Sequence, residues 1–144
     1  MRKIFRPLAS LLILIFCIST TAKADKTQTD KIQCAKSALY EVFSVVDCQH
    51  CISGNTSGFI IQFSKEGMSS TILMSYLFGD EETDKLWKEY KAATVDLHHE
   101  LCSYIEQCGI QKPNLTLMLT DHEEKETIYL LIVNGQVVYD FLDK

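Results

Sequence analysis

Apolar residues recur at spacings of three and four in two stretches of the chain, and this periodicity predicts two amphipathic helices. The first helix is expected over 30–46 and the second, longer one over 81–108. Acidic residues crowd the first turn of the long helix, where they favour the positive end of the helix dipole. Gly109 supplies the left-handed residue that commonly follows a last helical turn. The long helix is therefore the clearest element in the sequence.

Between the two helices, the residues change to β-branched and aromatic types. The segments 58–63 and 68–78 predict a hairpin joined by a turn over 64–67. Leu73 and Leu77 lie between the alternating apolar residues of 68–78, so a helix is the alternative for this segment. The segment before this hairpin, 48–58, is rich in glycine and asparagine and is expected to be a loop.

After the long helix, three further strands are expected over 115–120, 127–133 and 136–142. Asn134-Gly135 is a strong signal for a two-residue hairpin turn, because both central residues of that turn need positive φ. Apolar residues occupy both parities of 127–133, so this strand is expected to be central and covered on both faces. The predicted order is α-β-β-α-β-β-β. It indicates a single α+β domain with a mostly antiparallel sheet and the long helix packed on one face.

The N-terminal segment has the three-part pattern of a secretory signal. A basic head is followed by the apolar run 8–18 and by small residues up to Ala24. The apolar run is shorter than the roughly 20 residues that a membrane-spanning helix needs. Cleavage between Ala24 and Asp25 is therefore predicted to remove residues 1–24 and to leave one exported domain over 25–144, with no transmembrane segment. A retained N-terminal anchor is the alternative, and the expected location is the periplasm or the cell exterior.

Charge narrows the choice of partner. The chain has 14 Lys and Arg against 19 Asp and Glu, and four of the basic residues but none of the acidic ones lie in 1–24. The predicted mature domain thus has 10 basic and 19 acidic residues, a net charge of −9. Such a domain is poorly suited to nucleic acid or an anionic membrane, and suits a basic protein partner better. No catalytic arrangement of Ser, His and Asp and no phosphate-binding glycine loop is visible. We therefore expect no cofactor and lean against an enzyme.

Five cysteines belong to the predicted mature domain, and an oxidising compartment favours their pairing. The disulfide candidates are Cys34, Cys48, Cys51 and Cys102. The odd number leaves one thiol over, and Cys108, on the apolar face of the long helix, is expected to be a free buried thiol. Cys102 and Cys108 are not expected to pair with each other. Six residues of helix rise by about 9 Å, which exceeds the roughly 7 Å that a disulfide spans between Cα atoms.

The motif Cys48-Gln-His-Cys51 is the one local pattern that could carry chemistry. Such a pair can exchange thiols and disulfides, and His50 between the sulfurs can stabilise a thiolate. The motif resembles that of the periplasmic thiol oxidases in the thioredoxin superfamily, which implies Cys48 as nucleophile and Cys51 as resolving thiol. The chain departs from that family after the motif, where 52–58 cannot continue the helix found there, and Pro113 is the only candidate for the proline that faces the sulfurs.

A metal site is a weaker alternative. Its ligands would be Cys48, Cys51, His98 and Cys102, of which the last two share a helix face at i, i+4 spacing. Structural zinc sites usually combine two close ligand pairs. Exported proteins more often use cysteines in disulfides, so no native metal is expected.

Three functions follow from these observations. The first is a small acidic binding domain, of the inhibitor or immunity type, that caps another protein. The short loop with His50 between two cysteines is similar in outline to the cysteine-closed histidine loop of periplasmic lysozyme inhibitors, which implies a basic partner. The second is a thiol–disulfide oxidoreductase that uses Cys48 and Cys51. The third is a structural, envelope-associated domain.

Overall fold

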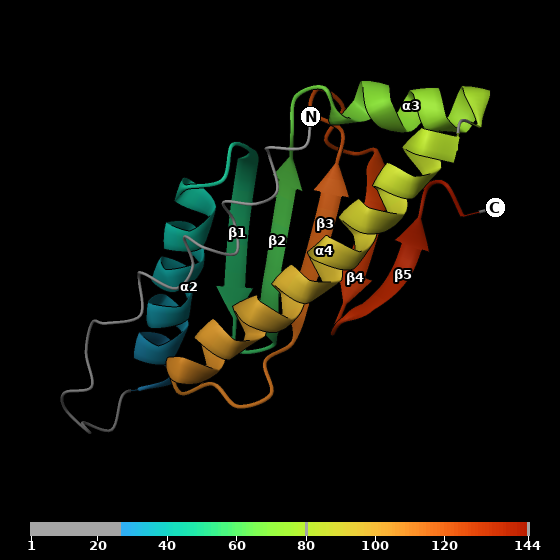
Figure 1. Cartoon of the computed structure of the whole chain (residues 1–144). Helices are drawn as coiled ribbons and strands as arrows, with labels where there is room; N and C mark the ends of the chain where they lie inside the picture. The colour runs from blue at the N-terminus through green and yellow to red at the C-terminus, as the bar shows by residue number, and fades with distance from the viewer. Residues whose placement is uncertain (1–26, 80, 144) are drawn as a thin grey trace.

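The computed structural model describes residues 27–79 and 81–143 (Figure 1). The predicted signal peptide and its cleavage site at Ala24 and Asp25 lie outside the described residues. In chain order the elements are α2 (Gln28–Ser44), β1 (Gln49–Asn55), β2 (Gly58–Ser64), α3 (Met68–Phe78), α4 (Glu81–Gln107), β3 (Leu115–Thr120), β4 (Ile128–Val133) and β5 (Gln136–Asp140).

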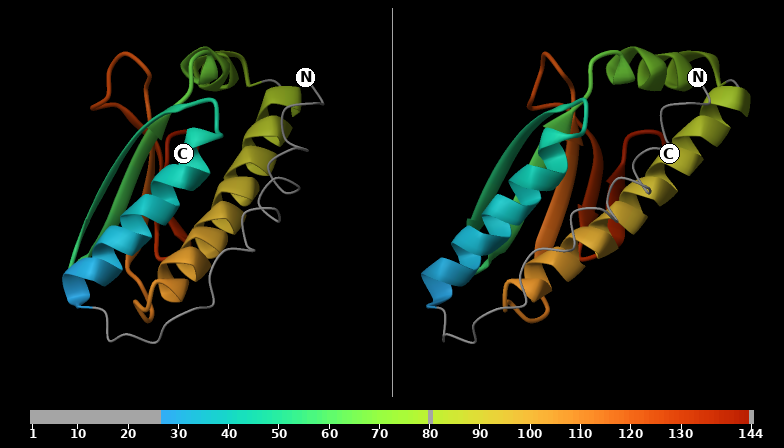
Figure 2. Two further views of the ribbon diagram at one scale, coloured as in Figure 1. Left: turned by 90° about the vertical axis from the view of Figure 1, so that its left-hand side faces the viewer. Right: turned by 60° about the vertical axis from the view of Figure 1, so that its left-hand side comes forward.

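The five strands form one sheet in the order β1-β2-β3-β4-β5. Only the central pair, β2 and β3, is parallel, and the other three pairs are antiparallel. The helices α2 and α4 lie side by side on the same face of this sheet (Figure 2). The predicted α+β domain, with a mostly antiparallel sheet and a long helix on one face, is confirmed.

The core lies between that face of the sheet and the two helices. The least exposed large side chains come from all of these elements, and none of them is more than 1% exposed. They include Leu39 and Phe43 of α2, Leu101 and Ile105 of α4, and Ile61, Leu117 and Ile132 of the sheet.

Both predicted helices are present. The Thr27 hydroxyl accepts a hydrogen bond from the backbone N–H of Asp30, and the Asp30 carboxylate accepts one from Thr27 in return. This capping box fixes the start of α2. Gly109, with a φ of 92°, ends the helical segment of α4 as predicted.

The segment 68–78 is the helix α3, so the predicted strand is wrong and the helical alternative holds. Both edges of β2 are occupied by β1 and β3, which leaves no strand partner for this segment. Gly67 and Gly79 adopt left-handed conformations at its two ends, with φ of 79° and 58°. These turns separate a short helix from its neighbours.

The predicted loop over 48–58 is also wrong, because most of it forms β1. This strand pairs with β2 from Gln49 opposite Ser64 to Asn55 opposite Gly58. The first hairpin is therefore β1–β2. The predicted element order holds only when α3 and α4 are counted as one interrupted helical segment.

The strands after α4 agree with prediction more closely. Asn134 and Gly135 have φ of 51° and 82°, as the expected hairpin turn requires. The strand β4 lies between β3 and β5, and its second face is covered only in part, at Tyr129, which is 4% exposed. Leu130 and Ile132 are buried under the helices, whereas Leu131 and Val133 are only partly buried. No described helix packs over that second face (Figure 2).

Candidate functional site

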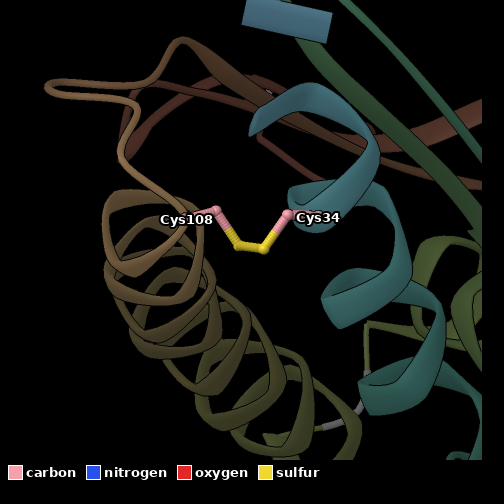
Figure 3. The surroundings of a disulfide bond; sticks show 2 residues. All are labelled: Cys34 and Cys108. Carbon is pink, nitrogen blue, oxygen red and sulfur yellow. A yellow bond between two sulfur atoms is a disulfide. The ribbon is translucent and has the colours of Figure 1, made fainter. Parts of the chain in front are cut away.

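The described disulfide joins Cys34 of α2 to Cys108, just beyond the end of α4 (Figure 3). The two Cα atoms are 5.8 Å apart. Cys34 was a disulfide candidate and is paired, whereas the prediction of Cys108 as a free buried thiol is wrong. Periodicity placed Cys108 correctly on the apolar face of its helix. That face packs against α2, where the partner sulfur lies.

The other three disulfide candidates, Cys48, Cys51 and Cys102, carry free thiols. The two cysteines of the Cys-x-x-Cys motif differ in exposure, with Cys48 just before β1 and Cys51 within it. Cys48 packs against the core and lies near enough to Tyr90 of α4 to affect its pKa, while Cys51 is exposed. Between them His50 points to the core side, with its ring 5.5 Å from that of Phe43.

This arrangement is unlike that of the thiol oxidases that the motif resembles. In those enzymes the motif opens a helix, whereas here it follows a helix and leads into an edge strand. Burial raises the pKa of the Cys48 thiol, although the charge of Lys65 opposes the effect. A raised pKa disfavours the thiolate that thiol–disulfide exchange needs. The geometry therefore gives little support to exchange within the motif.

A pocket of about 370 Å³ opens beside the motif. The Gln62 side chain spans its wall, with Nε2 donating to Lys125 O at 3.2 Å and to Thr120 Oγ1 at 3.4 Å. These bonds hold the β3–β4 loop over the sheet. The pocket is lined by Cys48, Gln49, His50, Cys51, Gln62, Phe63, Ser64, Thr120 and Lys125.

The structure brings two of the four predicted metal ligands together. Cys102 Sγ lies 3.7 Å from His98 Nδ1 on α4. Cys48 and Cys51 do not join them. Among the described residues no group of three or more His, Cys, Asp or Glu side chains is placed to hold a metal ion. The hydrogen bonds of His98 instead give it a structural role.

His98 is 2% exposed and links α4 to the start of β3 and to the β4–β5 turn. Its Nε2 atom lies 2.9 Å from Leu115 O and 3.1 Å from the backbone N of Gly135. Burial lowers the pKa of His98, which the bond to Leu115 partly offsets. One ring nitrogen cannot donate and accept at once, so Nε2 of the neutral ring either donates to Leu115 O or accepts from the Gly135 N–H. Protonation makes both ring nitrogens donors, which allows the bond to Leu115 O and excludes the one from Gly135.

His98 should make stability depend on pH. Its pKa is below the unfolded value of about 6.5, so the stabilisation is present above that pH and is lost as the pH falls through the folded pKa. We expect the free energy of unfolding, measured by urea denaturation, to fall between pH 7 and pH 5 by no more than about 1.4 kcal/mol per pH unit for this one group. H98Q should flatten this slope and H99Q should keep it. Equal slopes in wild type and H98Q would contradict the assignment.

The feature that sequence reasoning missed is the outward face of α3. The inward face carries Ile72 and Ser75, and the Ser75 hydroxyl donates to the Asp84 carboxylate of α4 at 2.9 Å. Ser69, near the start of α3, lies beside Asp121. The helix is thus held to the domain by the buried Ile72 side chain and by the Ser75–Asp84 hydrogen bond.

Five of its other large apolar side chains are exposed to solvent. We call these five residues the α3 apolar surface, and their exposed fractions run from 44% to 69%. They are Leu73, Met74, Tyr76, Leu77 and Phe78. The helix lies across one end of the sheet, next to the start of α4 (Figure 1). The ring of Tyr76, one of these five residues, lies 5.3 Å from the ring of Phe141. Phe141 directly follows the exposed edge strand β5.

Acidic residues stand at both ends of the α3 apolar surface. After Phe78, the first turn of α4 carries Glu81, Glu82 and Asp84. At the other end, the β3–β4 loop brings Asp121 beside Ser69, followed by further acidic residues at positions 123, 124 and 126.

Asp121 keeps its charge at this end of the surface. The neighbouring Ser69 hydroxyl lowers the pKa of Asp121, and the Tyr129 hydroxyl, which donates at 2.6 Å, adds to the effect. The backbone N–H groups of Glu123 and Glu124 donate to the same carboxylate. Its pKa is therefore well below the usual range, and the group is ionised at any pH at which the protein is expected to work.

Comparison of the chain with protein-family models, with curated proteins and with solved structures gives no significant match. Within residues 27–79 and 81–143, no helix is both long and apolar enough to cross a membrane. Function is therefore argued from the surfaces and side chains themselves.

Proposed function

We propose that this chain is an exported, non-catalytic protein-binding domain, of the inhibitor or immunity type, that caps a basic protein partner. The observation that carries the proposal is the orientation of α3. Ile72 and Ser75 face the domain, while Leu77 and Phe78 are 61% and 69% exposed. A contiguous exposed apolar patch on a small domain commonly marks an interaction site.

The energetics of that patch favour a partner. Burying one Leu, Met or Phe side chain stabilises a complex by roughly 1.5–3 kcal/mol before the costs of association. Four such side chains and Tyr76 on one helix are enough to supply an apolar interface centre, with the acidic residues around it as a polar rim. The domain would lose none of its own core contacts on binding.

Charge supports a basic partner. The predicted mature domain has a net charge of −9, and acidic residues stand at both ends of the α3 apolar surface. Opposite charges across an interface raise the association rate and reject partners of the wrong sign. The Cys34–Cys108 disulfide is compatible with an oxidising compartment, where such domains cap other proteins.

Site-specific photo-crosslinking in the producing cells tests the proposal. A photoreactive side chain at position 78 should give one discrete adduct. The matched probe at Thr56, an exposed residue of the β1–β2 turn, should give none. The crosslinked protein should be basic, and its purified form should bind the domain with an affinity that falls steeply with salt. Absence of an adduct anywhere on the α3 apolar surface, or a binding affinity that does not change with salt, would contradict the proposal.

A further inference from the structure

We infer that the α3 apolar surface binds an amphipathic helix of the partner, apolar along its centre and carrying Lys or Arg at both ends. This inference rests on the proposed function and specifies the partner's binding element. It is carried by three features of the described residues: the spacing of the exposed side chains, the pairing of the neighbouring edge strand, and the placement of charge.

The exposed side chains are spaced for helix packing. Leu73 and Leu77 are four residues apart, as are Met74 and Phe78, so they form two adjacent ridges along α3. A second helix can place its own side chains between such ridges. The 11 residues of α3 extend about 16 Å, so a partner helix of three or four turns would cover the whole surface.

Strand addition is less suited to this end of the molecule. The backbone groups of α3 are used within the helix, so only side-chain packing is available on its outer face. The nearby edge strand β5 changes register between its pairs Tyr139–Leu131 and Val137–Ile132, which leaves Val138 as an extra residue. Such an irregularity twists an edge strand and interrupts the pairing that an added strand would need.

The acidic residues beside the α3 apolar surface favour one kind of binding partner over the others. Glu81 and Glu82 follow one end of the surface, and Asp121 lies at the other. A helix with basic residues at both ends would place opposite charges at each of these positions. A second copy of this domain would bring acidic residues against acidic residues, and an anionic membrane would be repelled in the same way.

The test uses two synthetic 14-residue helical peptides with the same leucine face, one with lysines at both ends and one with glutamates. Fluorescence anisotropy with the purified full chain should give a dissociation constant at least tenfold lower for the lysine peptide. L77S/F78S should weaken this binding at least tenfold. The matched control I60S, which alters an exposed apolar residue of the sheet, should leave the binding unchanged. E81K/E82K should reduce the preference for the lysine peptide.

Four outcomes would overturn the inference. Equal binding of the lysine peptide by wild type and L77S/F78S would show attraction that does not use α3. A wild-type dimer that L77S/F78S dissociates in analytical ultracentrifugation would make a second copy the occupant. Sedimentation of the wild-type protein with vesicles of mixed phosphatidylcholine and phosphatidylglycerol would make a membrane the occupant of this surface. If crosslinking at position 78 succeeds and both peptides fail to bind, the helical mode is wrong while the proposed function stands.

Discussion

Replacing both Cys34 and Cys108 with alanine should lower the free energy of unfolding by about 4 kcal/mol. The disulfide joins residues 74 positions apart, so in the unfolded chain it closes a long loop and removes much conformational freedom. In the folded chain it ties the first helix to the end of α4, and these two helices together cover the sheet. A domain of this size has a stability of only about 5–15 kcal/mol, so the loss would be a large share of the total.

Urea denaturation of the oxidised protein, the reduced protein and C34A/C108A measures this effect. The reduced wild type and the double variant should unfold at similar urea concentrations, well below that of the oxidised protein. C102A changes a cysteine of the same helix that is a free thiol and serves as the control. A difference below about 1 kcal/mol between the oxidised protein and C34A/C108A would mean that the disulfide adds little beyond helix packing.

The second large effect is expected at Asp140, at the end of β5. Its side chain is 3% exposed, forms an ion pair with Lys91 and accepts a hydrogen bond from Trp87 Nε1 at 2.9 Å. The backbone N–H of Leu142 donates to the same carboxylate. Burial alone would raise the pKa of Asp140, but these donors outweigh it and hold the pKa below the usual value. One carboxylate thus joins α4 to the C-terminal strand.

D140A should therefore cost about 3 kcal/mol of unfolding free energy, because it leaves a buried indole N–H and a partly buried ammonium without their acceptor. The value is toward the lower end for a broken buried pair, since Lys91 is 25% exposed and keeps some solvation. Chemical denaturation followed by the fluorescence of Trp87, the single tryptophan, measures it. D140N should lie between D140A and wild type, and D143N, at an exposed neighbour, should stay near wild type. A loss for D140A no greater than that for D143N would contradict the role given to Asp140.

The sequence predicts best the elements that have a long apolar periodicity or a turn with a specific backbone requirement. The apolar periodicity of α4 predicts the helix correctly, although its buried face is made by Trp87, Thr94, His98, Leu101 and Ile105 and Leu86 is 44% exposed. The Asn134-Gly135 turn has a local conformational requirement. The strand β1 escapes detection because it is a polar edge strand in which Ile52 alone is buried. Its pairing with β2 depends on a neighbour, which a periodicity argument does not include.

The helix α3 is only the alternative prediction for its segment, for a different reason. Ile72, Met74, Tyr76 and Phe78 alternate as in a strand, and the segment has no polar face of the usual kind. Apart from Ile72, most of its large apolar residues are exposed, so the rule that places apolar residues inside gives the wrong answer for them in the isolated domain. The same limit applies to the cysteines. Spacing along one helix excluded a bond between Cys102 and Cys108, but the pairing of Cys34 with Cys108 depends on how two helices cross.

The parallel pair β2–β3 also has a consequence for the order in which the chain can fold. Phe59 pairs with Leu115, and the whole of α3 and α4 lies between them in sequence. A chain that emerges from the ribosome N-terminus first can form the β1–β2 hairpin early, but β2 then has one open edge until β3 is synthesised. Long-range pairing of this kind is slow and leaves the nascent chain exposed to aggregation. We therefore expect the sheet to assemble beyond the β1–β2 hairpin only once residues 115–120 are available to pair with β2, with chaperone binding to the hairpin before that point.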